Sequence, residues 1–494
     1  MKNYTIFRTL LVLGPLWYCL AVLSIFFLRS AYPFELEWME GGTLIHLLRL
    51  QAGLPLYVAP SLEYAPFIYP PFYYYVSLGI SQLTGLGGFL PLRLVSILST
   101  AGSAFVIAIL VQKQTQSRFW AFLSAGVFLA TFRAGGAWFD IARVDMLFTF
   151  LLLAAIYAGT ASDHWLSMVF AGLLLGVAFY TKQTALAYAT FFICASWFFR
   201  GWRFALISGA SFVFFAMSSF LIEDHISMGW YRYYIFTLPG NHKLYSPVWL
   251  LMLVQAYNIV YPLSISIVIS LFGIVPYKKR LTGQVAFLVA CALGLVALSG
   301  ASSLNVGAYA NNYIPAFAGF SLLFGIGAFW LESRLLRFVN RPVPILMFYT
   351  ACLLQFVLLY FNVSQQIPTA EDRRTGEQLV AQMRAVEGDV FAPYNVSLPI
   401  LAGKPAFAHL VALMEIEGHF GDVRDPQWAF LKREFENDIQ QRRFAALVLN
   451  HEYELWQQVG LFYSLTSIEY GADGTFLPVT GTSTRPTGFW LPSP

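Results

Sequence analysis

Three carboxylates lie close together directly after the first apolar run of the sequence. Residues 34–42 read Phe-Glu-Leu-Glu-Trp-Met-Glu-Gly-Gly and include Glu35, Glu37 and Glu40. Loop carboxylates are ordinarily solvated, and Glu40 would also favour the positive end of a helix that follows it. We keep that explanation for Glu35. For Glu37 and Glu40 we favour a catalytic role, because acids beside an apolar surface pay a solvation cost that function would explain.

A second group of charges lies in the short turn between two later apolar runs. Residues 139–146 read Phe-Asp-Ile-Ala-Arg-Val-Asp-Met, and their charged members are Asp140, Arg143 and Asp145. Asp145 stands where a helix N-cap is expected, and Asp140 is free to pair with Arg143. Two acids and an arginine in one tight turn are equally suited to a phosphate or a metal ion. Both interpretations stay open for this turn.

Basic and amide side chains occupy the remaining short connections between apolar runs. Lys182 stands alone in Tyr-Thr-Lys-Gln-Thr at 180–184, where its ammonium either extends toward water or binds an anion. Aromatic faces suit a sugar ring, cations suit a phosphate, and a carboxylate suits the removal of a hydroxyl proton. The pattern therefore predicts a site for a sugar and a phosphate. Its further candidate ligands are Tyr69, Arg232, His242, Lys243, Asn312 and Tyr313.

These side chains must be positioned by helices that cross a membrane. Hydrophobic residues make up 58% of the chain and charged residues 11%, so the polar groups are too few to cover a water-facing surface. A run at 70–84 is too short for a ~30 Å hydrocarbon core and opens with prolines and tyrosines, which favours an interfacial helix. The eleven predicted spans are residues 9–28, 91–112, 119–139, 145–162, 165–181, 183–199, 204–222, 248–275, 283–302, 312–331 and 343–361.

The distribution of basic residues predicts the orientation of these spans. With 70–84 in the interface and the N-terminus in the cytoplasm, lysines and arginines collect in the cytoplasmic turns. The run at 9–28 lacks a good cleavage site and is predicted to be an uncleaved signal anchor. We therefore expect a multi-pass protein of the plasma or inner membrane, with the chain after residue 361 on the outer face. The cytoplasmic turns are 112–118, 162–164, 200–203, 277–280 and 332–341.

The chain after residue 361 differs in composition from the rest. Residues 362–494 contain charge runs and turn signals, with an amphipathic helix expected at 425–441 and a buried strand at 444–449. We predict a transmembrane catalytic domain at 1–361 and a small extracytoplasmic α/β domain at 362–494.

Composition also excludes two classes of partner and site. The net charge is +4, and no basic cluster is interleaved with aromatic residues, so nucleic acid is not an expected partner. The cysteines all fall inside apolar runs, which excludes a disulfide framework and a cysteine metal cluster. They are Cys19, Cys194, Cys291 and Cys352.

Short motifs follow one another in a set order along the membrane portion of the chain. They are the acidic segment at 37–41, Gln-Ala-Gly-Leu-Pro at 51–55, Tyr-Pro-Pro-Phe-Tyr-Tyr-Tyr at 69–75, Leu-Arg-Leu at 92–94, Arg-Val-Asp-Met-Leu at 143–147, Thr-Lys-Gln at 181–183 and Asn-Tyr-Ile-Pro at 312–315. This series resembles the GT-C class of integral membrane glycosyltransferases. The most similar branch contains the protein O-mannosyltransferases and the bacterial transferase that adds aminoarabinose to lipid A.

The resemblance implies a polyprenyl-phosphate-sugar donor and an inverting single displacement on the outer face. A lipid, glycan or protein hydroxyl would be the acceptor. The catalytic aspartate of the family's first loop falls at or next to Glu37, where this sequence has glutamate. The base is therefore Glu37 or Glu40, and Asp145 matches the family's second acidic position.

The resemblance also bears on the phosphate and on a metal. Lys182, Arg143 and Arg232 are the cations expected to stabilise the departing lipid phosphate. His242 resembles a histidine that helps to hold a metal in the lipid A enzyme, whereas the glutamate expected just before Pro70 is absent. We therefore leave the metal unassigned: no cofactor is certain, and a divalent metal is an alternative.

Three other functions compete with glycosyl transfer from a lipid monophosphate. An oligosaccharide ligase would use a diphosphate-linked donor, and the sequence does not separate it from the first hypothesis. A lipid-sugar flippase or transporter would perform no covalent chemistry, but the internal repeats and broken midplane helices of such proteins are not found in this sequence. A structural scaffold is the least favoured, because the acids cluster on one side of the membrane.

Overall fold

The computed structural model describes residues 2–276, 283–338, 343–421, 424–450 and 453–494 of the chain. Within these residues, six helices are long and apolar enough to cross a membrane, and five shorter apolar helices accompany them. These six and five helices coincide with the eleven apolar runs that the sequence predicts. The protein is thus a polytopic helical protein with a small sheet region near its C-terminus.

The membrane portion is built around one central helix. The spanning helices are α1 (Lys2–Ser30), α4 (Leu90–Thr115), α5 (Arg118–Ala130), α6 (Asp145–Ala161), α7 (Trp165–Phe179), α8 (Ala185–Arg200), α9 (Trp202–Ile226), α12 (Val248–Val260) with α13 (Ser264–Ile274), α14 (Gly283–Ser302), α15 (Ile314–Phe338) and α16 (Val343–Leu358). Helix α15 packs against α4, α5, α13 and α14 and is the most deeply buried of the long spans. Spans such as α1, α9 and α16 expose large apolar side chains, as a lipid environment requires.

One predicted span ends earlier than its apolar run. The run at 119–139 predicts a helix to its end, whereas α5 stops at Ala130. The chain then turns through Gly136 and Ala137, whose φ angles are 77° and 59°. Such left-handed conformations end helical hydrogen bonding. Residues 138–144 therefore lie in a loop rather than in a helix.

Short helices occupy the connections between the spans. Helices α2 (Glu40–Gln51) and α3 (Phe72–Thr84) pack against each other. Helix α3 also packs against α4. With 13 residues, α3 reaches about 20 Å, which is less than a ~30 Å hydrocarbon core. Its length therefore fits the interfacial helix predicted at 70–84. The other short elements are α10 (Trp230–Arg232), η1 (Tyr233–Thr237), α11 (Leu238–Gly240), η2 (Tyr261–Leu263) and η4 (Ala310–Tyr313).

Residues 362–494, called the C-terminal region below, fold around a four-stranded sheet of order β1-β2-β4-β3. Strand β1 (Val390–Phe391) runs parallel to β2 (Ala446–Leu449), whereas β4 (Gly488–Pro492) is antiparallel to β2 and to β3 (Tyr463–Ser467). The strand predicted at 444–449 and the helix predicted at 425–441 are both confirmed. The helices are α17 (Ala370–Ala385), α18 (Ser397–Leu401), α19 (Leu410–Glu417) and α20 (Pro426–Gln440), with short turns η5 (Ser364–Gln366), η6 (Glu454–Trp456) and η7 (Val459–Leu461).

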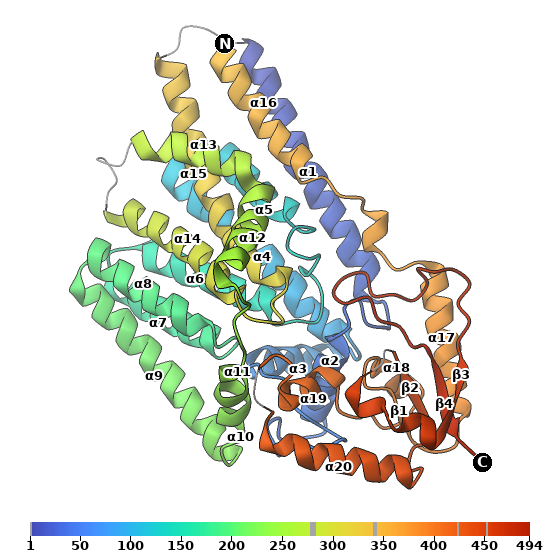
Figure 1. The fold of residues 1–494 in the computed structure, drawn as a ribbon. Helices are drawn as coiled ribbons and strands as arrows, with labels where there is room; N and C mark the ends of the chain where they lie inside the picture. Colours follow the sequence, from blue (N-terminus) through green and yellow to red (C-terminus); the bar gives the residue numbers. More distant parts are fainter. Residues whose placement is uncertain (1, 277–282, 339–342, 422–423, 451–452) are drawn as a thin grey trace.

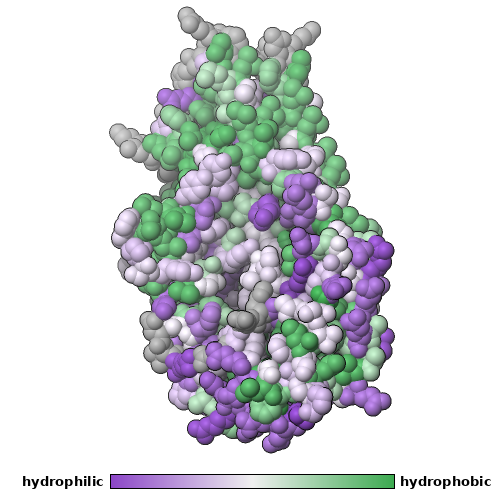
Figure 2. Space-filling view, turned by 45° about the vertical axis from the view of Figure 1, so that its right-hand side comes forward, coloured by the Kyte–Doolittle hydropathy of each residue, from purple (hydrophilic) through white to green (hydrophobic). Residues whose placement is uncertain are grey.

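The C-terminal region lies at one end of the helical bundle, next to α2, α3 and α11 (Figure 1). The N-terminal end of α1 lies at the opposite end. Figure 2 shows apolar surface concentrated over the helical end and hydrophilic surface concentrated at the end that carries the C-terminal region. The connections that carry the candidate residues therefore meet the C-terminal region at the polar end of the molecule.

Candidate active site

A cavity of about 560 Å³ lies where the connections between the spans meet the C-terminal region. Its wall combines the loop after α1, the turns before α6 and α8, the segments before α12 and α15, and parts of the C-terminal region. Six side chains predicted from the sequence line it, namely Glu37, Tyr69, Arg143, Lys182, His242 and Asn312. A smaller recess adjoins the cavity at Lys182 and contains Asp145. The fold thus brings together residues that are far apart in the chain.

Glu37 presents a fully buried carboxylate of which one oxygen is unoccupied. Oε2 accepts a hydrogen bond from the backbone N–H of Met39 at 3.1 Å, whereas Oε1 has no hydrogen-bond partner in the described part of the chain. Burial raises the pKa of Glu37 to about 8, and the positive charge of Arg143 partly opposes that rise. A carboxylate in a cavity wall that has a raised pKa and an oxygen without a hydrogen-bond partner is suited to accept a proton.

The C-terminal region closes the cavity behind Glu37. The backbone N–H of Thr480 donates to the carbonyl of Leu36 at 3.3 Å, which forms a one-residue β-bridge beside Glu37. The next residue, Gly481, has φ of 80°, and a Cβ atom there would stand 2.8 Å from Oε1 of Glu37. Only glycine fits both the conformation and the space. A loop more than 400 residues away in sequence therefore determines the surroundings of this carboxylate.

Arg143 contributes a buried cation that has no acidic partner within ion-pair distance among the described residues. Its Nη2 donates to the hydroxyl of Tyr69 at 3.0 Å, and its Nη1 lies 3.1 Å from the sulfur of Met39. The guanidinium also lies over the ring of Trp138, 5.0 Å from the ring centroid. Its Nε is buried without a hydrogen-bond partner. The positive charge is therefore available to an anion that enters the cavity.

Lys182, in contrast, is already paired with an acid. Its ammonium lies 2.8 Å from Oδ1 of Asp145 and donates to the amide oxygen of Asn312 at 3.2 Å. Asn311 donates to the same Asp145 oxygen at 2.8 Å. Asp145 is the first residue of α6, and the N-cap is Val144, so the side chain of Asp145 serves Lys182 rather than capping the helix. Its second oxygen, Oδ2, has no partner within the described residues.

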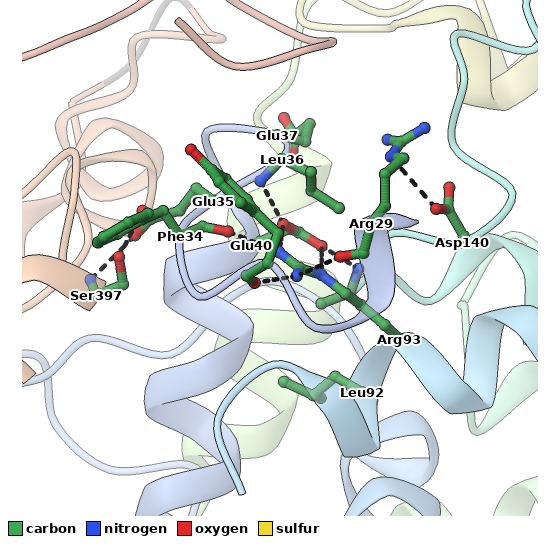
Figure 3. Close-up of polar contacts among 12 residues, drawn as sticks. Arg29, Phe34, Glu35, Leu36, Glu37, Glu40, Leu92, Arg93, Asp140 and Ser397 are labelled. Carbon is green, nitrogen blue, oxygen red and sulfur yellow. Dashed lines mark hydrogen bonds and ion pairs between the residues drawn. The ribbon is translucent and has the colours of Figure 1, made fainter. Parts of the chain in front are cut away.

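Glu40 differs from Glu37 because every oxygen of its side chain is occupied (Figure 3). Oε2 accepts from Arg93 at 2.7 Å and from the N–H of Leu36 at 2.6 Å. Oε1 accepts from Arg93 at 3.1 Å and from the N–H of Ala142 at 2.6 Å. Glu40 also lies outside the wall of the cavity. Of the two candidates for the base, Glu37 is the one that lines the cavity and has an oxygen without a hydrogen-bond partner in the described residues.

Asp140 and Glu35 hold neighbouring segments together (Figure 3). Asp140 pairs with Arg29 at 3.3 Å, and not with Arg143 as one interpretation of the sequence expects. Glu35 accepts hydrogen bonds from the N–H and the hydroxyl of Ser397 at 3.0 and 2.6 Å, which ties the first loop to the C-terminal region. Neither acid lines the cavity.

His242 lies in the cavity wall beside a carboxylate that the sequence did not indicate. Its Nε2 is 2.6 Å from an oxygen of Glu415 in α19. Catalytic zinc sites ordinarily use three protein ligands. No group of three or more His, Cys, Asp or Glu side chains is arranged to hold a metal ion in the described residues. The described side chains thus do not fit a zinc centre with three such ligands, and we derive no step through a metal.

Besides Asp140, three further predicted ligands lie outside the cavity wall. Arg232 is exposed and lies 3.8 Å from an oxygen of Asp224. Tyr313 directs its hydroxyl to α12, where it bonds to Gln255 and to Asn258. The third, Lys243, donates its backbone N–H to the carbonyl of Phe420 in the C-terminal region.

The sequence did not single out the aromatic and C-terminal parts of the wall. The rings of Trp138 and Tyr309 stack with centroids 5.3 Å apart, and the indole N–H of Trp138 is buried without a partner in the described chain. Trp138 stands two residues before Asp140. The charged turn that marked Asp140, Arg143 and Asp145 as candidates could therefore also have pointed to Trp138. Tyr394 and Thr484 had no such signal, because only the tertiary fold brings the C-terminal region against the first loop.

Residues 67–298, slightly less than half of the chain, match the model of glycosyltransferase family 87. The matched residues include Arg143 and Lys182 of the cavity wall, whereas Glu37 and the wall residues between 302 and 312 lie outside the match. No curated protein sequence matches the chain.

The fold is also found among solved structures. ArnT from Cupriavidus metallidurans bound to undecaprenyl phosphate is similar at 12% identity with a TM-score of 0.61, over 97% of both chains. The apo structure of the same protein is similar at 13% identity with a TM-score of 0.60, again over 97% of both chains. The apo oligosaccharyltransferase from Archaeoglobus fulgidus is similar at 11% identity with a TM-score of 0.51. The match covers 88% of this chain and 69% of that one. With the family match, this GT-C fold makes the chain a multi-pass membrane glycosyltransferase.

Proposed function

We propose that this glycosyltransferase moves a sugar from a polyprenyl-phosphate-linked donor to a hydroxyl group of a lipid, glycan or protein acceptor. The observation that carries the proposal is the position of Glu37, whose side chain lines the same cavity as the guanidinium of Arg143. Within the described residues, Oε1 of Glu37 has no hydrogen-bond partner and Arg143 has no acidic partner within ion-pair distance. A proton acceptor and an anion-binding cation in one cavity are the two groups that such a transfer requires.

The proposed reaction is a single displacement with inversion at the anomeric carbon. Glu37 takes the proton of the acceptor hydroxyl while the acceptor oxygen forms its bond to the anomeric carbon. The bond from that carbon to the phosphate oxygen breaks on the opposite face, and the electron pair leaves with the polyprenyl phosphate. Arg143 stabilises the negative charge that develops on this phosphate.

The cations of the cavity favour a monophosphate over a diphosphate donor. Arg143 and Lys182 are the lysine and arginine side chains that line the described wall. Lys182 is neutralised by Asp145 at 2.8 Å, so Arg143 supplies most of the free positive charge. A diphosphate carries more negative charge and would need further cations or a metal. The oligosaccharide ligase hypothesis is therefore the weaker one.

A related structure supports a polyprenyl phosphate as the lipid partner. The ArnT structure with the same fold holds undecaprenyl phosphate. We extend that ligand class to this chain because the cavity adjoins a bundle of apolar helices and contains Arg143, which has no acidic partner among the described residues. We place the site on the outer face of the plasma or inner membrane, as the distribution of basic residues predicts.

The test is a transfer assay with the purified chain in nanodiscs. Polyprenyl-monophosphate sugars and polyprenyl-diphosphate sugars are offered with an acceptor panel, and the anomeric configuration of the product is determined. We expect transfer from the monophosphate donors with inversion. Glu37→Gln keeps the shape of the side chain and should lower kcat by about 10²–10⁴-fold, the range of general base catalysis.

Glu63→Gln is the matched control, because Glu63 is an exposed acid of the same connection, paired with Arg443 at 2.7 Å. This variant should transfer sugar at the wild-type rate. Full activity of Glu37→Gln, or transfer from diphosphate donors alone, would contradict the proposal.

A further inference from the structure

A second cavity, of about 380 Å³, shares no wall residue with the first. It lies between the end of α9 and the segment that joins α2 to α3, at the end of the molecule that carries the C-terminal region (Figure 1). Its wall includes the backbone and side chains of residues 53–56, the rings of Tyr57 and Tyr75, and the carboxylate of Glu223. A carboxylate thus meets aromatic rings where a spanning helix ends.

Glu223 is buried in the last turn of α9, and two phenols already bind it. Tyr75 donates to its Oε1 at 3.0 Å, and Tyr180 donates to the same oxygen. Oε2 retains its capacity to accept hydrogen bonds. The position at the C-terminal end of a helix is unfavourable for an anion and favourable for a cation.

The buried acids of the other described spanning helices have cationic partners, which makes Glu223 exceptional. Asp145 pairs with Lys182 at 2.8 Å, and Glu332 pairs with Arg8 at 3.5 Å. No lysine, arginine or histidine pairs with Glu223 within the described residues. A buried carboxylate that has hydrogen bonds but no cationic partner remains costly, and an external cation would reduce that cost.

A positive charge of the protein lies next to the wall of the same cavity, at Pro55. Arg49 of α2 donates from Nε to the carbonyl oxygen of Pro55, a residue of the cavity wall, at 2.5 Å. The guanidinium stacks on Tyr64, 4.1 Å from the ring centroid, and pairs with no acid in the described chain. The cavity therefore offers a carboxylate in its wall, and a guanidinium lies next to that wall.

Apolar side chains surround the cavity on its outward side. Leu54 and Ile226 belong to its wall and are exposed, and Ile222 is exposed one turn earlier on α9. In a membrane protein such exposed side chains contact lipid tails. A ligand suited to this cavity would combine a charged head near Glu223 and Arg49 with an apolar body along α9.

We propose that this cavity binds a phospholipid whose headgroup carries a primary ammonium next to its phosphate. The ammonium lies against Glu223 and the rings of Tyr57 and Tyr75, and the phosphate lies toward Arg49. A primary ammonium has three N–H donors, which match the free oxygen of Glu223 and the phenolic oxygens beside it. A trimethylammonium head has no such donors, and a glycerol head has no charge for Glu223. This binding is independent of the proposed glycosyl transfer.

The experiment measures which lipids stay bound to the full chain. The protein is placed in nanodiscs of phosphatidylglycerol mixed with an equal amount of phosphatidylethanolamine or phosphatidylcholine, and native mass spectrometry counts retained lipids. We expect the wild type to retain phosphatidylethanolamine in preference to both other lipids. Glu223→Gln should reduce that preference by about tenfold or more, because a hydrogen-bonded charge pair is lost.

Glu332→Gln is the matched control, since it removes a buried carboxylate that already has Arg8 as partner. It should leave the lipid preference unchanged. Leu54→Trp, which fills the cavity from its exposed side, should remove the preference without touching Glu223. Equal retention of the three lipids by the wild type would overturn the proposal, as would a Glu223→Gln variant with wild-type preference. The wild-type comparison decides the matter even where a variant fails to fold.

Discussion

Arg93 and Glu40 form a bidentate ion pair in which both side chains are fully buried, with contacts of 2.7 and 3.1 Å. The same guanidinium donates to the carbonyl oxygens of Arg29, Tyr32 and Phe34. Arg93 thus gathers the end of α1 and the start of the first loop around one charge. A network with this many satisfied partners rigidifies the backbone that it joins.

Glu40 extends this network to both sides of the cavity. One of its oxygens accepts from the N–H of Leu36, which precedes Glu37, and the other from the N–H of Ala142, which precedes Arg143. A single carboxylate therefore fixes the backbone next to the proposed base and next to the proposed phosphate ligand. We infer that Glu40 is a positioning residue.

Removal of the Glu40 charge should therefore destabilise the fold. Glu40→Gln leaves Arg93 buried without a carboxylate, and a broken buried pair costs about 3–5 kcal/mol. We expect a clearly lower Tm in detergent, measured by circular dichroism. The control is again Glu63→Gln, because a surface pair is worth ~0–1 kcal/mol. An unchanged Tm for Glu40→Gln would contradict the positioning role.

The spans were predictable from sequence because each depends on a local property, the length of an apolar run. The runs at 145–162 and 283–302 appear in the structure as α6 and α14 with ends shifted by two residues or fewer. The run at 119–139 is the exception. Glycine and alanine at 136 and 137 adopt positive φ there, and an apolar composition does not reveal such a turn.

The partners of the charged residues were less predictable, because they depend on contacts between distant segments. Asp140 lies three residues from Arg143 but pairs with Arg29, and Glu37 resembles Glu40 in the sequence although only Glu37 faces the cavity. Composition could place these acids near one another. The roles of Glu37 and Glu40 could be told apart only once the tertiary positions of Arg93 and of the C-terminal region were known.

Activity should depend on pH through Glu37. The carboxyl must be ionised to accept a proton, and burial raises its pKa to about 8. We therefore expect kcat/KM to fall as pH decreases below that value and to level off above it. The positive charge of Arg143 opposes the raised pKa, so Arg143→Met should move the midpoint to higher pH. A flat profile between pH 6 and about 9 would exclude Glu37 as the titrating base.

The loop behind Glu37 should be sensitive to a single methyl group. Gly481→Ala places a Cβ atom 2.8 Å from Oε1 of Glu37. We expect lower kcat and a shifted pH profile, because the carboxylate must move. Gly403→Ala is the control: Gly403 has a similar φ of 78° but nothing within 4 Å of the added atom. Equal activities of the two variants would show that the contact with Glu37 has no catalytic effect.

Orientation can be tested by cysteine labelling in a cysteine-free background. An impermeant reagent applied from outside should label exposed positions 59 and 377, and should miss exposed positions 116 and 337. The basic residues near 116 and 337 are the reason for this expectation. Labelling of 116 from outside would reverse the proposed orientation of every span that follows the first.

The final prediction separates the two cations of the cavity. Arg143 has no acidic partner among the described residues, so Arg143→Met should weaken donor binding by about 10–100-fold, the value of a hydrogen bond to a charged group. Arg143→Lys should restore only part of it, because lysine cannot form a bidentate contact with phosphate. Lys182→Met leaves Asp145 unpaired in the interior and should lower Tm.

The double variant Lys182→Met with Asp145→Asn removes both charges of that pair and should recover the lost stability. If Lys182 mainly neutralises Asp145, this double variant binds the donor nearly as well as the wild type. Donor affinity and Tm are measured for all four variants in nanodiscs with a polyprenyl-monophosphate sugar. A stable double variant that binds as weakly as Arg143→Met would instead make Lys182 an equal phosphate ligand, because its charge would then be needed beyond the pair with Asp145.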